Sequence, residues 1–492
     1  MAHQPMDMIR IEWRPDKQAK ASIYSQIVAF FQERITSGDW VSGQKLPSQR
    51  KLAEMFGVNR STIVEAMDEL QALGLLEGSH GGGTRVANEG WAMLIQDKTP
   101  DWQSYIKASR FYPNVPTVQI VNRLEFQSGI TRMSTGELSP ELMQTKITQD
   151  ILSQLSDRKL FMNYPDPLGM PSLRRAIQAH LKKNGIEVPI SSILIVSGAL
   201  QALQLISIGI VKSQARVFVE SPSYLGSLNI FQSVGAQLVS VPMDAQGIAP
   251  WRTKDMQSGG AHSLLYTIPT FQNPTGCVMP ASRRREVLQY CTERHIPIIE
   301  DDVFRDLWLD APPPPPMKAI DRCGSVVYIS SLSKCFSPGF RLGWLVGPEA
   351  IVQRLADAKM QMDYGVSVLT QQVAEELFTG GLYEQGVQNI RTRLKTRRDF
   401  MMRLLERWMD GLADWNCPAG GFFVWLRLRN RVQAESLFKR ALTEGLLIMP
   451  GGVYDKNHTS SVRLTYGYLP EEEMERGVRR LSEMLRGLQN ET

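Results

Sequence analysis

The segment SLSKCFSPGFRLGW, residues 331–344, combines an amine with groups that bind anions. Lys334 lies among the small hydroxyl residues Ser331 and Ser333, and Arg341 follows in a stretch that proline and glycine keep out of regular structure. A neutral lysine amine reacts with aldehydes, whereas hydroxyls and an arginine fork hold phosphate. The segment predicts a reactive lysine beside an anion-binding site. A solvated lysine in a loop is the alternative interpretation.

Other segments offer one group for each remaining part of pyridoxal phosphate, an aldehyde cofactor that binds lysine. Asp301 ends the apolar run IPIIEDD and could keep the ring nitrogen protonated. Asn273 in FQNPTGC is an amide donor for the ring oxygen, and Tyr224 in SPSYLG could stack on the ring. Gly198 in SGALQAL precedes a helix whose first N–H groups could bind an anion. Each motif alone is more often a turn or a helix cap, so the prediction depends on their combination.

A different chemistry is predicted for LPSQRKLAEMFGVNRSTIVEAMDEL, residues 46–70. Two short helical patterns are separated by a glycine turn, and LLEGSHGGGTRVAN after them reads as two strands around glycines. With a further helical pattern at 22–37, the order predicts a winged helix-turn-helix, in which the second helix of the motif enters the DNA major groove. An ordinary helical hairpin with a solvated charged face is the alternative.

The residues at the start of that recognition helix suit DNA. Arg60 could bind guanine or phosphate through its planar fork, and neighbouring hydroxyls suit phosphate oxygens. The predicted DNA contacts here are Asn59, Arg60, Ser61 and Thr62. Positive charge is concentrated in the same region. Between residues 45 and 62 the only acidic residue is Glu54, whereas the basic residues are Lys45, Arg50, Lys51 and Arg60.

Length and composition limit the remaining possibilities. A chain of 492 residues is expected to form two or three domains, and 43% hydrophobic with 21% charged residues is typical of a globular protein. The net charge of +5 is only mildly basic, so DNA binding must be local. Five cysteines without a paired spacing predict no disulfide framework and indicate the cytoplasm, and no metal site is expected. The uncharged stretch 193–211 is long enough to span a membrane, but a buried strand followed by a buried helix is the preferred interpretation.

From about residue 124 onward, apolar strand runs alternate with helical patterns, which predicts a mainly parallel α/β sheet. Residues 89–123 are expected to be a connector, and their aromatic content predicts that they pack on another part of the protein.

Two parts of the chain resemble known families. GQKLPSQRKLAEMFGVNRSTIVEAMDELQALGLLEGSHGGGTRV is similar to the DNA-binding domain of GntR-type bacterial repressors, over about residues 20–87. This resemblance implies that Gln49, Arg50, Arg60 and Thr62 contact double-stranded DNA. Val64 stands where some relatives have a second recognition-helix arginine, so their operator sequences do not carry over.

The second part resembles fold-type I aminotransferases of the aspartate-aminotransferase superfamily, through YPDPLGMPSLRRAIQAHL, NPTG, EDDVF, SLSKCFSPGFRLGW, PAGGFFVWL and SVRLTYG. It implies a mainly parallel seven-stranded sheet between helices, followed by a small C-terminal α/β subdomain. Lys334 would bind pyridoxal phosphate covalently, with Asn273 at the ring oxygen, Asp301 at the ring nitrogen and Tyr224 stacked on the ring. Ser331, Ser333, Arg341 and the Gly198–Ala199 turn would hold the phosphate. Arg463 would bind an effector or substrate carboxylate, and Tyr164 would reach the phosphate of a partner subunit in a homodimer.

Two departures from the aminotransferase pattern bear on activity. Phe304 occupies the place of a tyrosine that usually bonds the ring oxygen, three residues after the aspartate. Ala199 and Leu200 replace a polar pair that many relatives place near the phosphate. We therefore expect the cofactor to bind and transamination to be at most slow.

Together the two resemblances identify the chain as a member of the MocR subfamily of bacterial regulators. The implied organisation is a DNA-binding domain at 20–88, a linker at 89–123 and a cofactor-binding domain at 124–492. The implied function is transcriptional regulation in the cytoplasm, with the second domain sensing an amino compound or the cofactor itself. A working aminotransferase is the alternative, and a repressor whose second domain serves only for dimerisation is a third possibility.

Overall fold

The structure is a computed structural model, and it divides into two compact units, residues 1–109 and 110–492. The residues that it describes are 9, 11, 13–19, 21–36, 39–40, 43–79, 83–87, 105, 108–109, 114–157, 160–224, 228–257, 262–430 and 432–491. Each unit has its own hydrophobic core, as expected for a chain of this length.

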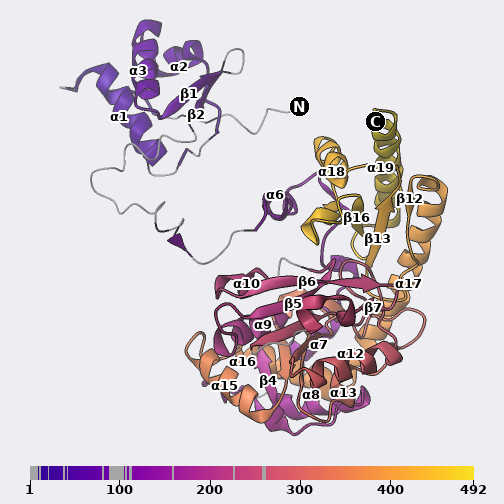
Figure 1. Cartoon of the computed structure of the whole chain (residues 1–492). Coiled ribbons are helices and arrows are strands. Elements are labelled where there is room, and N and C mark those ends of the chain that lie inside the picture. Colours follow the sequence, from indigo (N-terminus) through magenta and orange to yellow (C-terminus); the bar gives the residue numbers. More distant parts are fainter. Residues whose placement is uncertain are drawn as a thin grey trace. The chain divides into compact units, whose positions relative to one another are not determined.

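The first unit is a winged helix-turn-helix, as predicted (Figure 1). Its elements are the helices α1 (Ile23–Thr36), α2 (Gln49–Phe56) and α3 (Arg60–Ala72) and the antiparallel strands β1 (Leu76–Ser79) and β2 (Gly83–Val86). Apolar side chains of the three helices are fully buried between them, among them Phe31, Leu52 and Ile63. The tip of the predicted wing, residues 80–82, lies outside the described residues.

The turn between α2 and α3 follows local backbone rules. Ser48 caps α2 by accepting a hydrogen bond from the backbone N–H of Lys51 at 3.4 Å. Gly57 ends α2 in the left-handed conformation, with a φ of 64°. Asn59 then takes an extended backbone, so that α3 begins at Arg60.

The core of this unit extends further toward the N-terminus than predicted. Ile9 and Ile11 are buried in it, and the Trp13 ring stacks on Phe30 at 4.2 Å. These residues precede the predicted start of the domain at residue 20, because an apolar alternation this short gives little signal in a sequence.

The second unit is built on a mainly parallel sheet, as predicted. The strand order is β4-β11-β10-β9-β8-β5-β6-β7, and β11 is antiparallel to both of its neighbours. The two-residue β7 pairs antiparallel with the edge strand β6 and adds an eighth strand to the seven that the family pattern implied. The strands are β4 (Ile193–Val196), β5 (Arg216–Ser221), β6 (Gln237–Asp244), β7 (Gly247–Ile248), β8 (Ser263–Thr267), β9 (Ile298–Asp301), β10 (Val326–Ser331) and β11 (Gly343–Val346).

Helices cover both faces of this sheet, because alternate side chains of each strand point to opposite faces. Val217 and Val219 pack with α9 and α15 on one face, whereas Phe218 packs with α12 on the other. The helices are α6 (Pro116–Leu124), α7 (Thr145–Ser156), α8 (Pro171–Lys183), α9 (Ala199–Gly209), α10 (Asn229–Ser233), α11 (Lys254–Gln257), α12 (Ala281–Glu293), α13 (Met317–Ile320), α14 (Leu332–Cys335), α15 (Glu349–Met360) and α16 (Val368–Thr379).

The C-terminal part of the chain forms the predicted small α/β subdomain, whose elements gather at one end of the unit (Figure 1). Its four-stranded sheet has the order β12-β13-β16-β15. The elements are the helices α17 (Leu382–Trp408), α18 (Ala434–Thr443) and α19 (Glu471–Glu491) and the strands β12 (Ala413–Asp414), β13 (Phe423–Leu428), β15 (Met449–Pro450) and β16 (Ser461–Thr465). The short strands β3 (Thr131–Arg132) and β14 (Leu446–Leu447) pair in parallel and join the residues before the main sheet to this subdomain.

Two further expectations concern single segments. The uncharged stretch 193–211 forms β4 and α9, and no helix in the described part of the chain is long and apolar enough to cross a membrane. Most of the predicted connector lies outside the described residues. Its last part belongs to α6, whose Val121 is buried in the core of the second unit.

Candidate functional site

The register of three strands brings distant loops together at one end of the main sheet. Ser331 at the end of β10 pairs with Gly343 of β11, and Gly343 pairs with Val196 at the end of β4. The loop after β4, the α14 turn after β10 and the loop before β11 therefore meet. A Cβ on Gly343 would lie 2.7 Å from the backbone oxygen of Ser330, so only glycine fits at this crossing.

These loops form a cradle lined with donors. The Arg341 guanidinium donates from Nη2 to the Ser197 carbonyl at 3.0 Å and from Nη1 to Ser333 Oγ at 3.3 Å. Ser333 Oγ lies 3.0 Å from Ser331 Oγ. Gly198 has a φ of 84°, and a Cβ there would lie 2.9 Å from Arg341 Nη2. The structure thus brings together the predicted phosphate ligands Ser331, Ser333, Arg341 and Gly198.

The start of α9 completes this cradle with backbone rather than side-chain groups. Ala199 is the first residue of α9 and has no polar side chain, and Leu200 is exposed. The side chain of Gln201 fixes the loop instead, because its Oε1 accepts a hydrogen bond from the Ser197 backbone N–H at 2.7 Å. Sequence reasoning missed Gln201, because the N-cap residue Gly198 lacks the hydroxyl that marks a capping box in a sequence.

Lys334 lies in the α14 turn, directly after β10. Its Nζ donates to the backbone oxygen of Gly136 at 2.6 Å. Burial, and after it the positive charge of Arg463, lower the pKa of Lys334 to about 8, although Glu137 and Asp301 act in the opposite direction. A lysine with this pKa supplies neutral amine close to neutral pH, which is what a reaction with an aldehyde requires.

Asp301 ends β9, the neighbour of β10, and so lies near Lys334. Its Oδ2 accepts a hydrogen bond from the Tyr266 hydroxyl at 2.7 Å. Its Oδ1 is buried and has no hydrogen-bond partner among the described residues. Burial raises the pKa of Asp301 to about 6, although the Tyr266 bond favours the charged form.

Asn273 and Arg463 are joined directly. The Arg463 guanidinium donates from Nη1 to Asn273 Oδ1 at 2.8 Å and from Nη2 to the Ser134 carbonyl at 2.6 Å. It also lies over the Phe423 ring at 3.9 Å and 5.3 Å from the centre of the Tyr454 ring. Arg463 is only 3% exposed, and its Nε is buried without a hydrogen-bond partner among the described residues.

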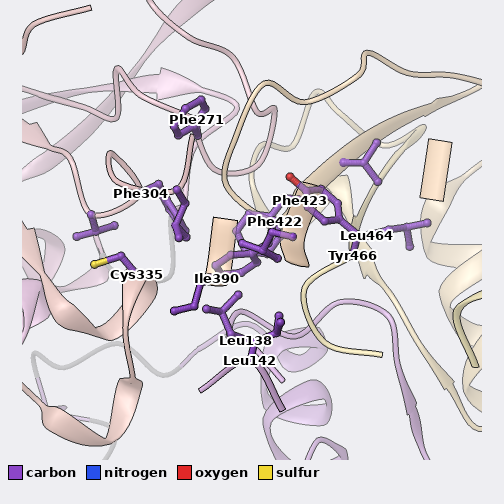
Figure 2. Close-up of a cluster of buried hydrophobic side chains, with 14 of the residues drawn as sticks. Leu138, Leu142, Phe271, Phe304, Cys335, Ile390, Phe422, Phe423, Leu464 and Tyr466 are labelled. Carbon is purple, nitrogen blue, oxygen red and sulfur yellow. The ribbon is translucent and has the colours of Figure 1, made fainter. Parts of the chain in front are cut away.

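Phe304 is buried where the large domain meets the small subdomain. Its ring packs edge-on against Phe422 at 5.6 Å and Phe423 at 5.8 Å. Figure 2 shows these rings together with Phe271 and Cys335 in one apolar cluster. Phe304 therefore contributes packing and has no group that can donate a hydrogen bond.

The two predicted tyrosines, Tyr224 and Tyr164, are both exposed. Tyr224 is 44% exposed and follows Ser223, whose backbone N–H donates to the Tyr454 carbonyl beside Arg463. Tyr164 is 79% exposed, and its ring lies 5.3 Å from that of Tyr364. Within this one chain the structure does not bring Tyr164 to the cradle by any described contact.

A buried acid that sequence reasoning missed supports the loops of Tyr224 and Asn273. Gln272 donates from Nε2 to Glu220 Oε2 at 3.0 Å and to the Pro222 carbonyl at 2.7 Å. Burial raises the pKa of Glu220 to about 7, against the hydrogen bonds that it accepts. A carboxylate inside the apolar strand run RVFVES is the signal that could have identified it.

The predicted DNA residues lie together at the start of the second and third helices of the first unit. Arg60 is the first residue of α3, is exposed, and takes part in no ion pair among the described residues. Arg50 is exposed and lies 3.5 Å from Glu54, a separation at which an exposed pair is worth little. The predicted set on this surface comprises Gln49, Arg50, Asn59, Arg60, Ser61 and Thr62, none of which is fully buried.

Fold and site together define the class of the protein: a winged helix-turn-helix joined to an aminotransferase fold. Residues 23–86 match the family described as bacterial regulatory proteins, gntR family, and residues 124–481 match the family described as aminotransferase class I and II. The uncharacterised HTH-type transcriptional regulators YdfD and YisV of Bacillus subtilis (strain 168) are 43% and 42% identical to the chain. The matches cover 96% of this chain and 98% of YdfD, and 97% of this chain and 99% of YisV.

A solved aminotransferase structure has the same fold as the second unit. The multiple substrate aminotransferase of Thermococcus profundus is 26% identical with a TM-score of 0.74, over 80% of this chain and 100% of that one. The chain belongs to the MocR subfamily of GntR-type transcriptional regulators.

Proposed function

We propose that the chain regulates transcription by binding DNA through its winged helix and pyridoxal phosphate through Lys334, with an amino compound or the cofactor itself as effector. The observation that carries this proposal is the combination of a half-buried lysine amine, whose pKa is lowered to about 8, with a donor-lined cradle that begins one residue before it. A scaffold used only for dimerisation has no need of such a lysine.

The residues present fit the cofactor. The buried Oδ1 of Asp301 needs a hydrogen-bond donor, and a protonated pyridine nitrogen is such a donor. Asn273 accepts from Arg463 through its oxygen, which leaves its amide N–H groups for the ring oxygen. Ser331, Ser333, Arg341 and the Gly198–Ala199 turn would hold the phosphate, and Tyr224 would cover the ring. When bound, pyridoxal phosphate supplies an aldehyde that condenses with amines.

The chain's own residues also provide for an effector. Arg463 is placed to bind a carboxylate, in exchange for one of its present bonds to Asn273 or Ser134. Binding there would change the contacts between β16 of the small subdomain and the large domain. An effector regulates only through different affinities for two conformations, and this exchange of partners is the difference that we propose.

At the other end of the chain, we propose that the α3 N-terminus contacts double-stranded DNA. Arg60 would bind guanine or phosphate, and Arg50 would bind phosphate. We further propose a cytoplasmic homodimer in which the exposed Tyr164 reaches the phosphate site of the partner subunit. The DNA target would then be a pair of half-sites.

We expect the rate at which Lys334 binds pyridoxal phosphate to rise with pH around a midpoint near 8, the value to which burial lowers its pKa. Below the midpoint the amine holds a proton and cannot attack an aldehyde, and above it the amine is neutral. The rate is measured by rapid mixing of cofactor-free protein with pyridoxal phosphate at a series of pH values. A rate that climbs toward the ordinary lysine pKa of about 10.4 would contradict the assignment.

The alternative function, a working aminotransferase, is disfavoured by Phe304. Its phenyl ring cannot donate to the ring oxygen, which then depends on Asn273 alone. We expect no more than slow half-transamination by the wild type, and a rise of roughly 2–10-fold in Phe304→Tyr, the worth of one hydrogen bond. The measurement is the spectral change on adding an amino acid, with and without a keto acid acceptor. Rapid multiple turnover by the wild type would favour the aminotransferase instead.

The proposed function is tested by absorbance and DNA binding of the same purified full-length protein. We expect a visible band after addition of pyridoxal phosphate, a change of that band as amino compounds are titrated in, and protection of DNA upstream of its own gene. A wild-type protein that stays colourless with excess pyridoxal phosphate would reject cofactor-based sensing.

A further inference from the structure

A hydrogen-bonded series of polar side chains, most of them buried, begins next to Lys334 and takes no part in the site described so far. The Cys335 thiol, next to Lys334, lies 3.1 Å from the Tyr383 hydroxyl. That hydroxyl donates to Asp306 Oδ2 at 2.5 Å. His180 Nε2 lies 3.5 Å from the same carboxylate oxygen.

The direction of these hydrogen bonds follows from chemistry. Burial alone would raise the pKa of Asp306, but His180 and the Tyr383 hydroxyl lower it to about 2, so the carboxylate is charged and only accepts. Tyr383 has one proton, and it goes to Asp306. Burial raises the pKa of Cys335 to about 12, so the thiol keeps its one proton, which it shares between the Tyr383 oxygen at 3.1 Å and the Ser331 carbonyl at 3.4 Å.

These groups come from separate elements. Cys335 belongs to α14, Tyr383 to α17 and His180 to α8, while Asp306 lies in the turn after β9. Rings of His180, Phe378 and Phe336 pack around Tyr383, which itself is 2% exposed. Tyr383 and Cys335 are almost fully buried, whereas the Asp306 side chain is 23% exposed, so a lost partner leaves a buried polar group at Tyr383 or Cys335.

The hydrogen bonds from Cys335 through Tyr383 to Asp306 connect the segment that carries Lys334 with the segment that carries Asp301. Asp301 and Asp306 are the two ends of one short segment, and Lys334 and Cys335 are neighbours in one turn. Tyr383 bonds both Asp306 and Cys335. It therefore fixes the distance between the acid predicted at the ring nitrogen and the lysine predicted to bind the aldehyde.

We propose that Tyr383, with Asp306 and Cys335, is a positioning residue that holds the Lys334 turn in place relative to Asp301. This inference rests on the proposed function, since it concerns residues that serve pyridoxal phosphate. None of the three side chains is among the residues proposed to hold the effector or the cofactor, and they would act through the two elements that carry Lys334 and Asp301.

The test is Tyr383→Phe in the full-length protein, with cofactor affinity and the pH midpoint of its absorption band as readouts. We expect pyridoxal phosphate to bind about 10- to 100-fold more weakly, the effect of losing a hydrogen bond to a charged group, and the midpoint of the band to shift. Tyr466→Phe is the matched control. Its hydroxyl donates to the Gly421 carbonyl at 2.9 Å in the same core, so it should cost stability and leave cofactor affinity unchanged.

A second pair of variants covers the case in which Tyr383→Phe fails to fold. Cys335→Ser keeps a donor to Tyr383 and should bind the cofactor like the wild type, whereas Cys335→Ala should weaken binding. Normal affinity and band in Tyr383→Phe, or equal affinities in the two Cys335 variants, would overturn the inference while leaving the proposed function intact. A wild type that binds no pyridoxal phosphate would instead overturn the proposed function, and this inference with it.

Discussion

Lys334→Ala is expected to abolish the visible absorption band that pyridoxal phosphate gives the wild-type protein. Among the lysines in the part of the chain that the structure describes, Lys334 alone has a pKa lowered to about 8 and lies in the same short turn as Ser333 of the cradle. The same variant should still bind DNA, because the winged helix has a core of its own. Its response to the effector should be lost.

The absorbance spectrum of the purified variant, and footprinting with and without effector, measure these outcomes. Lys318→Ala is a suitable control, since Lys318 is also buried, donates to the Val326 carbonyl at the other end of β10, and is paired with Asp321 at 3.1 Å. It should lose stability and keep the band. A full effector response in Lys334→Ala would show that the second domain signals without its lysine.

Arg60→Ala is expected to weaken DNA binding by about 1–3 kcal/mol if Arg60 forms a bidentate contact with guanine. Arg60 is exposed at the first position of α3, where the helix N-terminus also favours phosphate. The cofactor spectrum should stay unchanged, because Arg60 belongs to the other compact unit.

The loss of affinity is measured by titrating DNA upstream of the chain's own gene at fixed salt concentration. Arg354→Ala removes one exposed positive charge from α15 of the second unit and serves as the control for net charge. Equal affinities of Arg60→Ala and Arg354→Ala would exclude Arg60 from the interface.

The winged helix could be predicted in detail because its signals are local. The cap at Ser48, the left-handed Gly57 and the apolar faces of the helices all act within a few residues. The Ile9–Trp13 extension could not be predicted, since it depends on packing against Phe30 and not on any local pattern.

The positions of most strands of the main sheet could be predicted from the sequence, but the order and direction in which they pair could not. Apolar runs identified most of its strands, whereas the antiparallel β11 between β4 and β10 depends on pairing between distant segments. This pairing places Arg341 beside Gly198, a contact that neither motif reveals by itself.

Contacts between distant segments also explain why some site residues were predicted and others were missed. Lys334, Asn273 and Asp301 lie in motifs that can be read from the sequence. Their partners Tyr266 and Gly136 lie in other segments and meet them only through strand pairing and the course of the chain. Sequence reasoning therefore gave the reacting groups, while the hydrogen-bond partners of Asp301 and Lys334 required the fold.

The length of α17 has a mechanical consequence. Its 27 residues form one uninterrupted helix of roughly 40 Å, which begins next to Tyr383 behind the lysine turn and ends among the helices of the small subdomain. A continuous helix resists bending because each turn is held by its own hydrogen bonds, so it moves as a stiff rod. A displacement at Tyr383 would therefore be passed along the rod to its other end, where α17 packs against α19 of the small subdomain. Chemistry at a single amine would in this way be felt at the far side of the small subdomain.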